Sequence, residues 1–346
     1  MTTQTQVDRA TSPPTAGAAS RHRPGDVALQ WGTGAMAAVT AALVFLIAIF
    51  LAVYAFPAIR FNGLDFLTTL TWNMGNQYGG GPVARNGIAG MPGASFGVVV
   101  FLYGTLMSSF VAMLVATPVA LLAAVAMVFR VPASLKTPVN TLVELMAGVP
   151  SVVFGLWGIV VLVPWIGNAL GPWLSAHLGW VPFLGGSIGT GNGLLASGVV
   201  LAIMILPIMA ATMRDVMSAV PSSIYEASIA LGGTSWQAVT QAVLPAARAG
   251  IFGAAMLALG RALGETMAVL MVSGAAMNQL PQNIYQPINT MAAVIVSQLD
   301  SALTDSTLLA VRSLAEIALV LFAITLVVNV GARLILRLAG NLERSA

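Results

Sequence analysis

The chain has 346 residues, of which 58% are hydrophobic and 7% are charged, and its mean hydropathy is +0.91. A soluble domain cannot bury that much apolar surface, so the composition predicts an all-α membrane protein with several spans. The chain has no cysteine and two histidines, which excludes a disulfide framework and a thiol metal site, so no metal or other cofactor is expected. We interpret the net charge of +3 as a marker of membrane topology rather than of nucleic-acid binding.

The first segment of the chain differs from the rest. Residues 1–30 are polar and rich in Pro, Ser and Thr, which predicts a disordered cytoplasmic N-terminus. The apolar run behind it is longer than the core of a signal peptide and is expected to remain as a membrane span. Residues 31–346 are therefore predicted to form one transmembrane domain.

Six apolar segments are long enough to cross a membrane, because a hydrocarbon core of about 30 Å needs roughly 20 helical residues. They lie at about residues 34–56, 97–128, 139–163, 193–212, 249–274 and 309–332. A further short helix is expected at about 291–298, in the long connection before the last span.

The positive charges predict the orientation of these spans. With the N-terminus inside, ten Arg and Lys residues fall on the inner side and two on the outer side. The inner residues are Arg9, Arg21, Arg23, Arg130, Lys136, Arg214, Arg248, Arg333, Arg337 and Arg344, and the outer ones are Arg60 and Arg85. We therefore expect a multi-pass protein of the inner (plasma) membrane with both termini in the cytoplasm.

Two short helices are predicted on the inner side, between the fourth and fifth spans. Ser223 and Glu226 have the spacing of a capping box and predict a helix start, and Gly232 predicts its end. Thr234 is placed to cap a second helix that ends at Pro245. Neither helix is long enough to span, so the pattern predicts a hairpin on the membrane surface, and a purely structural interfacial hairpin also explains it.

The residues of this hairpin carry a more specific signature. The stretch "EASIALGGTSWQAVTQAVLP" resembles the EAA loop of ABC importer permeases, with Ser228 in place of the usual Ala and Ala242 in place of a branched residue. In that family the hairpin, here residues 221–245, fits a groove on an ATPase subunit. The resemblance implies such a coupling role for Glu226, Ala227, Leu231, Gly232, Leu244 and Pro245.

This chain carries no phosphate-binding loop of its own. Its only lysine, Lys136, lies in "VPASLKTP" without the Gly-rich approach that cradles a nucleotide phosphate. The energy for any transport is therefore expected from a partner or from an ion gradient, and the chain itself is not expected to be an enzyme.

The fifth predicted span contains two charged residues, Arg261 and Glu265, in "GRALGETMAVL". A charge at mid-span costs at least about 2.5–3.5 kcal/mol, so neither group is expected to face lipid. The two are four residues apart and can pair, either simply to hold the bundle together or as part of a substrate path. Gly260, Gly264 and Ala268 are also four apart and predict a small-residue seam for a neighbouring helix.

"GRALGETMAV" resembles the PstC family, the permease subunits of phosphate-specific ABC importers. "LMAGVPSVVFGLWGIVVLVPWI" and "FLYGTLMSSFVAMLVATPVALLAAV" resemble the same family, and the similarity covers about residues 97–340. The resemblance implies a MetI-like type I importer permease with a phosphate path that includes Arg261, Glu265 and Thr266. It also implies four kinds of partner: a PstA-like permease, two PstB-like ATPase subunits, a PstS-like phosphate-binding protein outside the membrane, and lipid.

Other charged residues are interpreted structurally. Arg312 and Glu316 are expected to form an ion pair near the outer end of the last span, and Glu144 to pair with Lys136, Arg214 or Arg248.

Three other functions are weighed against phosphate import. A permease for another oxyanion, such as sulfate or molybdate, stays open because a separate binding protein can set the selectivity. A gradient-driven transporter or channel is disfavoured by the absence of an inverted repeat and of paired broken helices. A membrane-embedded enzyme is disfavoured because Arg261 and Glu265 alone are not a catalytic constellation.

Overall fold

A computed structural model describes the backbone of residues 24–342 and the side chains of residues 29–334. The chain divides into two compact units, Met1–Phe50 and Leu51–Ala346. Most of the predicted disordered segment 1–30 lies outside the described residues, but α1 begins at Pro24, so residues 24–30 are helical.

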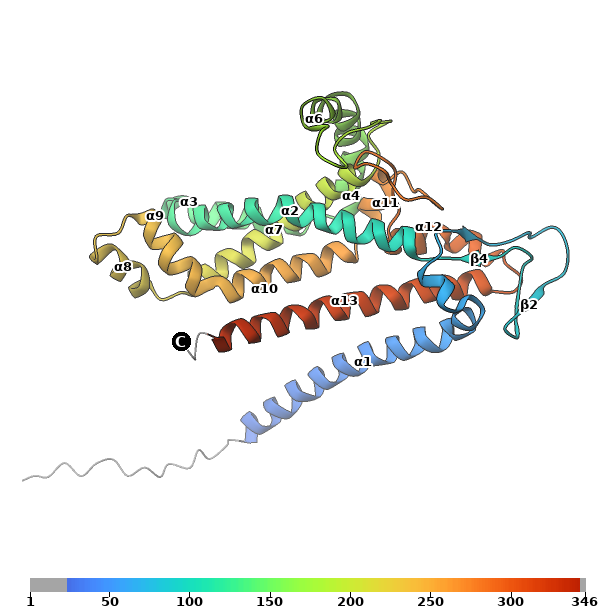
Figure 1. Cartoon of the computed structure of the whole chain (residues 1–346). Helices are drawn as coiled ribbons and strands as arrows, with labels where there is room; N and C mark the ends of the chain where they lie inside the picture. Colours follow the sequence, from blue (N-terminus) through green and yellow to red (C-terminus); the bar gives the residue numbers. More distant parts are fainter. Residues whose placement is uncertain (1–23, 343–346) are drawn as a thin grey trace, which may run out of the picture. The chain divides into compact units, whose positions relative to one another are not determined.

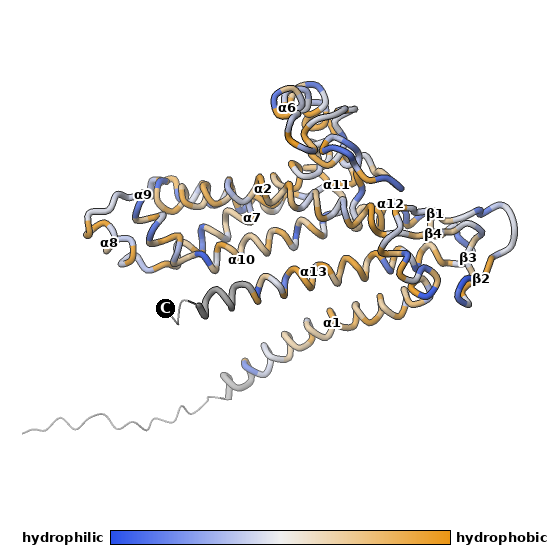
Figure 2. The backbone as a smooth tube through the Cα atoms, in the orientation of Figure 1, coloured by the Kyte–Doolittle hydropathy of each residue, from blue (hydrophilic) through white to orange (hydrophobic). Residues whose placement is uncertain are grey.

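The described part of the chain contains six helical segments long and apolar enough to cross a membrane, as the sequence predicts. They are Leu29–Leu67, Val99–Phe129, Ser151–Leu178, Leu194–Ser218, Ser235–Leu263 and Leu309–Leu334. Hydrophobic residues dominate these segments, and hydrophilic residues lie mostly near their ends and in the loops (Figure 2).

The helices that form and connect these spans follow one another along the chain (Figure 1). They are α1 (Pro24–Asn62), η1 (Gly63–Leu67), α2 (Val99–Phe129), α3 (Ala133–Ala147), α4 (Ser151–Trp157), η2 (Gly158–Leu162), α5 (Val163–Trp165), η3 (Ile166–Leu170), α6 (Gly171–Leu178), α7 (Leu194–Ser218), α8 (Ser222–Ala230), α9 (Ser235–Gln237), η4 (Ala238–Val243), α10 (Leu244–Leu263), α11 (Met267–Val272), α12 (Met291–Leu303) and α13 (Leu309–Leu342). Of these, α12 is the short helix predicted at 291–298, extended by several residues.

The loop between α1 and α2 contains two small antiparallel strand pairs. Strand β1 (Trp72–Asn73) pairs with β4 (Ser95–Phe96), and β2 (Val83–Arg85) pairs with β3 (Ile88–Gly90). The Trp72 ring packs edge-on against Phe96 and Phe101, with ring centroids 4.9 and 5.7 Å away. These aromatic contacts hold the loop against the start of α2.

The third span does not lie at 139–163, where the sequence predicts it. Residues 133–147 form α3, which has no buried residue and ends at Gly148, and the span begins only after Pro150. Pro150 is extended, with a ψ of 137°, and its ring pushes the residue before it out of the helical region, so the two helices cannot merge. The span then runs to Leu178, well past its predicted end at residue 163.

Proline also explains how the long spans continue. Each of the three π-helical segments, η2, η3 and η4, ends two residues before a proline: Pro164, Pro172 and Pro245. A proline in a regular α-helix clashes with a carbonyl of the preceding turn and removes one hydrogen bond. A wider π turn at that place relieves the clash, so the helix passes through the proline instead of stopping.

The core of the membrane unit is built from close contacts between small residues. On α2, Ala112, Ala116, Ala120 and Ala124 recur every fourth residue and have no exposed surface, and they belong to one cluster with α7 and α10. These three helices run side by side (Figure 1). Lipid is as apolar as such a core, so tight packing rather than hydrophobicity holds the helices together.

This tight packing can be tested at Gly104 of α2. A methyl group there would lie 2.0 Å from the carbonyl oxygen of Asn289, whereas one at Gly253 of α10 would meet no atom within 4 Å. We expect Gly104→Ala to destabilise the protein by about 1–3 kcal/mol. Gly253→Ala should leave stability unchanged or raise it by about 0.5–1 kcal/mol, because alanine favours the helix.

The measurement is the apparent melting temperature of each purified variant in one detergent. Equal melting temperatures for the two variants would show that α2 does not approach Asn289 this closely.

Candidate functional site

The stretch "GRALGETM" is a break between two helices, not the middle of one. Helix α10 ends at Leu263, and α11 begins at Met267, so the predicted fifth span at 249–274 is wrong and the span is Ser235–Leu263. Gly264 has the lowest helix propensity of any residue apart from proline, and it stands where the helix stops. Residues 264–266 link the two helices without regular structure.

Arg261 and Glu265 do not form the ion pair that their spacing predicts. The Glu265 carboxylate instead accepts a hydrogen bond from the backbone N–H of Ala268, at 3.3 Å, in the first turn of α11. Among the described residues, no acidic side chain lies within 4.0 Å of the Arg261 guanidinium. The helix break changes the separation on which the prediction depends, because i,i+4 neighbours face each other only on a continuous helix.

Arg261 lines a cavity of about 440 Å³ between three spans. The cavity is bordered by Ile208 of α7, by Leu257, Gly260 and Arg261 of α10, and by Thr325 and Asn329 of α13. Ile208 and Thr325 lie well inside their spans, more than two turns from either end, so the cavity lies deep within the depth of α7 and α13. The structure therefore places an exposed, unpaired cation beside an open groove at mid-span depth on the membrane unit.

Sequence reasoning missed Thr325 and Asn329. Their side chains are four residues apart on α13, and each donates a hydrogen bond of 2.8 Å to the carbonyl one turn earlier, that of Leu321 or Thr325. The second N–H of the Asn329 amide is not used by these bonds. Two polar side chains at this spacing in an otherwise apolar run are the signal that could have indicated them.

The predicted seam residues lie on two different helices. Gly260 faces α13, because a methyl group there would lie 3.9 Å from the Asn329 amide nitrogen. Ala268 belongs to α11 and is fully buried, and a methyl group at Gly155 of α4 would lie 3.1 Å from its Cα. A methyl group at Gly264 would have only the backbone oxygens of Gly260 and Arg261, in its own helix turn, within 4 Å. Glu265 and Thr266 are half-buried and do not line the cavity that contains Arg261.

The predicted hairpin at 221–245 is present in part. Helix α8 starts directly after Pro221 without a side-chain cap, so the expected Ser223–Glu226 capping box does not form. Gly232, with a φ of +89°, ends the helix as predicted. Thr234 and Gln237 form a capping box: the Thr234 hydroxyl accepts from the Gln237 N–H, and the Gln237 side chain accepts from the Thr234 N–H.

The second arm of this hairpin does not end at Pro245. It passes through η4 and becomes α10, with Leu244 and Pro245 in the first turn of that helix. A π segment directly precedes Pro245, and its wider turn accommodates the proline without ending the helix. One continuous helical segment therefore joins the hairpin to Arg261.

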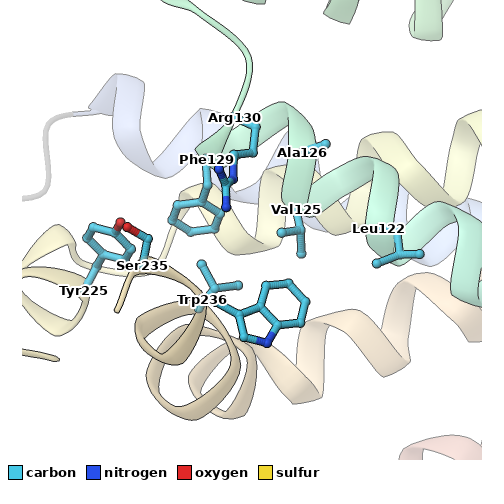
Figure 3. Close-up of a pocket in the computed structure, with 9 residues that line it drawn as sticks. Leu122, Val125, Ala126, Phe129, Arg130, Tyr225, Ser235 and Trp236 are labelled. Atoms are coloured by element: carbon cyan, nitrogen blue, oxygen red, sulfur yellow. The ribbon is translucent and has the colours of Figure 1, made fainter. Parts of the chain in front are cut away.

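The first arm of the hairpin contacts α2. The ring of Tyr225 stacks on Phe129, at the end of α2, with centroids 5.4 Å apart and planes inclined by 23° (Figure 3). The other side of the hairpin is open: Glu226 and Ala227 are exposed, and Leu231 exposes 91% of its surface.

Glu144 and Glu316 are held in structural contacts. Glu144 of α3 accepts a hydrogen bond from Arg214 of α7 at 3.2 Å, as predicted, and Arg214 also bonds Asp215 at 2.7 Å. The predicted Arg312–Glu316 pair does not form, because the buried Glu316 carboxylate accepts from the Asn62 amide at 2.9 Å instead. In the described part of the chain, no three His, Cys, Asp or Glu residues are close enough to hold a metal ion.

Six spans, a surface hairpin joined to one of them and a cation beside a cavity in the membrane interior define a membrane transport component. The chain belongs to the family of binding-protein-dependent transport system inner membrane components, which it matches over residues 116–341. This membership and the six spans confirm the predicted all-α, MetI-like permease fold and make the chain a multi-pass membrane protein.

Phosphate permeases are among its relatives with a more specific name. The chain is 48% identical over 282 residues to the phosphate transport system permease protein PstC 1 of Mycobacterium tuberculosis, covering 81% of this chain and 83% of that protein. It is 36% identical over 293 residues to PstC of Mesorhizobium japonicum, covering 84% and 83%. These relatives confirm the resemblance to the PstC family noted from the sequence.

Among solved structures, the chain is similar to the MetNI methionine ABC transporter in an inward-facing conformation. The sequence identity is 20%, the TM-score is 0.46, and the match covers 69% of this chain and 93% of that one.

The capping box at Thr234 gives a test of the hairpin. Thr234→Ala should weaken the start of the second arm by about 1 kcal/mol, because the Gln237 N–H loses its acceptor. Amide hydrogens at 235–238 should then exchange about fivefold faster in hydrogen-exchange mass spectrometry. Thr234→Ser keeps the hydroxyl and should exchange like the wild type, and equal exchange in all three proteins would contradict the assignment.

Proposed function

We propose that this chain is a transmembrane subunit of an ATP-driven importer of inorganic phosphate and that it forms part of the path of the anion. The names of its relatives support the substrate, since those proteins are phosphate transport permeases at 36–48% identity. The single observation that carries the proposal is the unpaired Arg261 in the cavity between α7, α10 and α13.

A lone cation at this depth needs a counter-ion at least part of the time. An isolated charge inside a membrane is costly, and functional sites are where such charges persist. A guanidinium stays charged at any relevant pH, and its planar fork matches two oxygens of a tetrahedral oxyanion. Phosphate in the cavity would therefore supply the partner that the described part of the chain does not.

The surrounding residues support this role in different ways. Gly260 leaves open the space between Arg261 and Asn329, and the second amide N–H of Asn329 is available to a phosphate oxygen. Glu265 holds the start of α11 instead of neutralising Arg261, so the guanidinium stays accessible. Thr266 belongs to the same helix break, and we place it beside the path rather than in the cavity.

The hairpin supports an ATPase as the partner that supplies energy. Its exposed residues Glu226, Ala227 and Leu231 form a surface on which another protein can dock, and the continuous segment from Thr234 to Leu263 leads from that surface to Arg261. A rigid helix transmits a displacement that a flexible loop would absorb. We propose that one of the two PstB-type ATPase subunits docks there, with Gly232, Leu244 and Pro245 shaping the hairpin.

The complete transporter would contain further subunits. A homologous permease of the PstA type would complete the path, and a PstS-type protein would deliver phosphate from outside the membrane. The distribution of positive residues supports an orientation with both termini in the cytoplasm. In domain terms, residues 1–30 would be a cytoplasmic extension, and residues 31–346 the permease domain.

The first test is phosphate uptake with Arg261→Gln. We expect uptake of labelled phosphate to fall at least tenfold, while the complex with its partner subunits still assembles and hydrolyses ATP. Arg312→Gln is the matched control, because Arg312 also lies on a spanning helix without an acidic partner within 4.0 Å among the described residues but does not line the cavity. It should transport normally.

The other outcomes each contradict one part of the proposal. Normal uptake by Arg261→Gln would mean that the cavity is not on the path, and failure to assemble would mean that Arg261 holds subunits together. Wild-type uptake of labelled sulfate in preference to phosphate would assign another oxyanion. Uptake that continues without ATP in proteoliposomes with an imposed ion gradient would indicate a gradient-driven transporter.

The hairpin has a separate test in Leu231→Lys. A charged side chain on this exposed apolar site should block docking, so the ATPase subunits should no longer copurify, and uptake should be lost while the permease stays folded. Leu64→Lys is a matched control, since Leu64 is also a highly exposed leucine but lies in η1, far from the hairpin in sequence. Copurification that survives Leu231→Lys would remove this surface from the interface.

A further inference from the structure

A second cavity, of about 240 Å³, lies where the hairpin meets the end of α2. It is lined by Leu122, Val125, Ala126, Phe129 and Arg130 of α2 and the residue after it, and by Tyr225, Ser235, Trp236 and Val239 of the hairpin (Figure 3). The exposed hairpin residues Glu226, Ala227 and Leu231 are not part of it, so this cavity is distinct from the surface proposed for the ATPase.

The two ends of the cavity differ in chemistry. One end is polar, with the Arg130 guanidinium and the hydroxyls of Tyr225 and Ser235, and Arg130 points from the end of α2 toward the hairpin (Figure 3). The other end is apolar and includes Leu122, which is 61% exposed, and the indole of Trp236, which is 57% exposed.

This order matches the order of layers in a membrane. Arg130 is the first residue after a spanning helix, which is the depth of lipid headgroups, and Leu122 lies eight residues earlier, about 12 Å deeper along the helix. Tryptophan is enriched at the boundary between headgroups and hydrocarbon. The cavity therefore runs from headgroup depth into acyl-chain depth along one face of α2.

The polar end carries positive charge without a carboxylate to neutralise it. No acidic side chain among the described residues lies within 4.0 Å of Arg130. Lys136 adds a second cation at the same end of α2, where its ammonium donates to the Val128 carbonyl at 3.1 Å. The hydroxyls of Tyr225 and Ser235 make no hydrogen bond with another described residue.

We propose that this cavity binds one anionic phospholipid. The phosphodiester would accept hydrogen bonds from the Arg130 guanidinium and the two hydroxyls, and the glycerol and the first part of an acyl chain would lie along Trp236 and Leu122. The lipid would then join α2 to the hairpin beside the Phe129–Tyr225 stack, so the lipid composition of the membrane would affect the seating of the hairpin.

The test is arginine-selective labelling with phenylglyoxal of the purified complex with its partner subunits, after its lipids have been removed. Labelling of Arg130 is read by peptide mass spectrometry, and Arg333, an exposed arginine at the end of the last span, is the internal control. Vesicle-derived phosphatidylglycerol should lower labelling of Arg130 about tenfold and that of Arg333 much less, and phosphatidylcholine should protect neither.

Three results would overturn the proposal. Protection by inorganic phosphate without lipid would make the cavity a site for the free anion. Protection of Arg130 before any lipid is added would mean that a partner subunit covers it. Equal labelling with and without phosphatidylglycerol would mean that no lipid binds there.

A second measurement uses variants. Native mass spectrometry of the complex should show about tenfold less bound phosphatidylglycerol for Arg130→Gln and an intermediate loss for Arg130→Lys, which keeps the charge but not the fork. Arg333→Gln should bind like the wild type. Unchanged binding by both Arg130 variants would also overturn the proposal.

Discussion

A backbone N–H or C=O in hydrocarbon has no water to bond, and this constraint decides where the helices of this chain continue, widen or stop. A π turn comes just before each of Pro164, Pro172 and Pro245, and the helix continues past the proline. A broken helix end in lipid would be more costly than this distortion. Where the chain does break, at residues 264–266, the Glu265 carboxylate accepts one of the freed N–H groups. The most consequential of these points is Pro245, since continuity there joins the hairpin to Arg261.

Small side chains allow the helices around that connection to pack closely. The alanine face of α2 lets α7 and α10 approach closely, and the absence of a side chain at Gly104 lets the chain before α12 approach α2. Close approach gives many weak contacts, which matter in a membrane because burial from lipid adds little. The same packing leaves an opening beside Gly260, where α13 does not fill the space next to α10.

The charged groups fall into two kinds, those that have a hydrogen-bond or ion-pair partner on another side chain and those that have no oppositely charged partner nearby. Arg214 bonds Glu144 and Asp215, and Glu316 bonds Asn62, so these groups hold elements together. Arg261 and Arg130 have no carboxylate within 4.0 Å among the described residues, and each lines a cavity. The two cavities lie at different depths, one beside the interior of α13 and one at the end of α2, which suits a transported anion and a lipid phosphate respectively.

Sequence spacing predicted two ion pairs, and neither forms. Arg261 and Glu265 are separated by a helix end, and Glu316 bonds a residue of α1 that lies far away in the sequence. Spacing of four residues brings side chains together only if the helix is continuous and no better partner reaches them from another element. Both conditions depend on tertiary structure.

The sequence by itself determined the class of protein, the number of spans, the presence of the hairpin and the cap at Thr234, and it pointed to the charged stretch at 260–266. These follow from local rules, because hydrophobic length, capping and charge cost act within one segment. The tertiary structure decided that the second arm of the hairpin continues into α10, that α3 is separate from the third span, that Thr325 and Asn329 stand beside Arg261, and that Arg261 is unpaired. Each of these depends on what a neighbouring helix supplies, such as a wider turn, an alternative hydrogen-bond partner or an unfilled space, and no single segment of sequence contains that information.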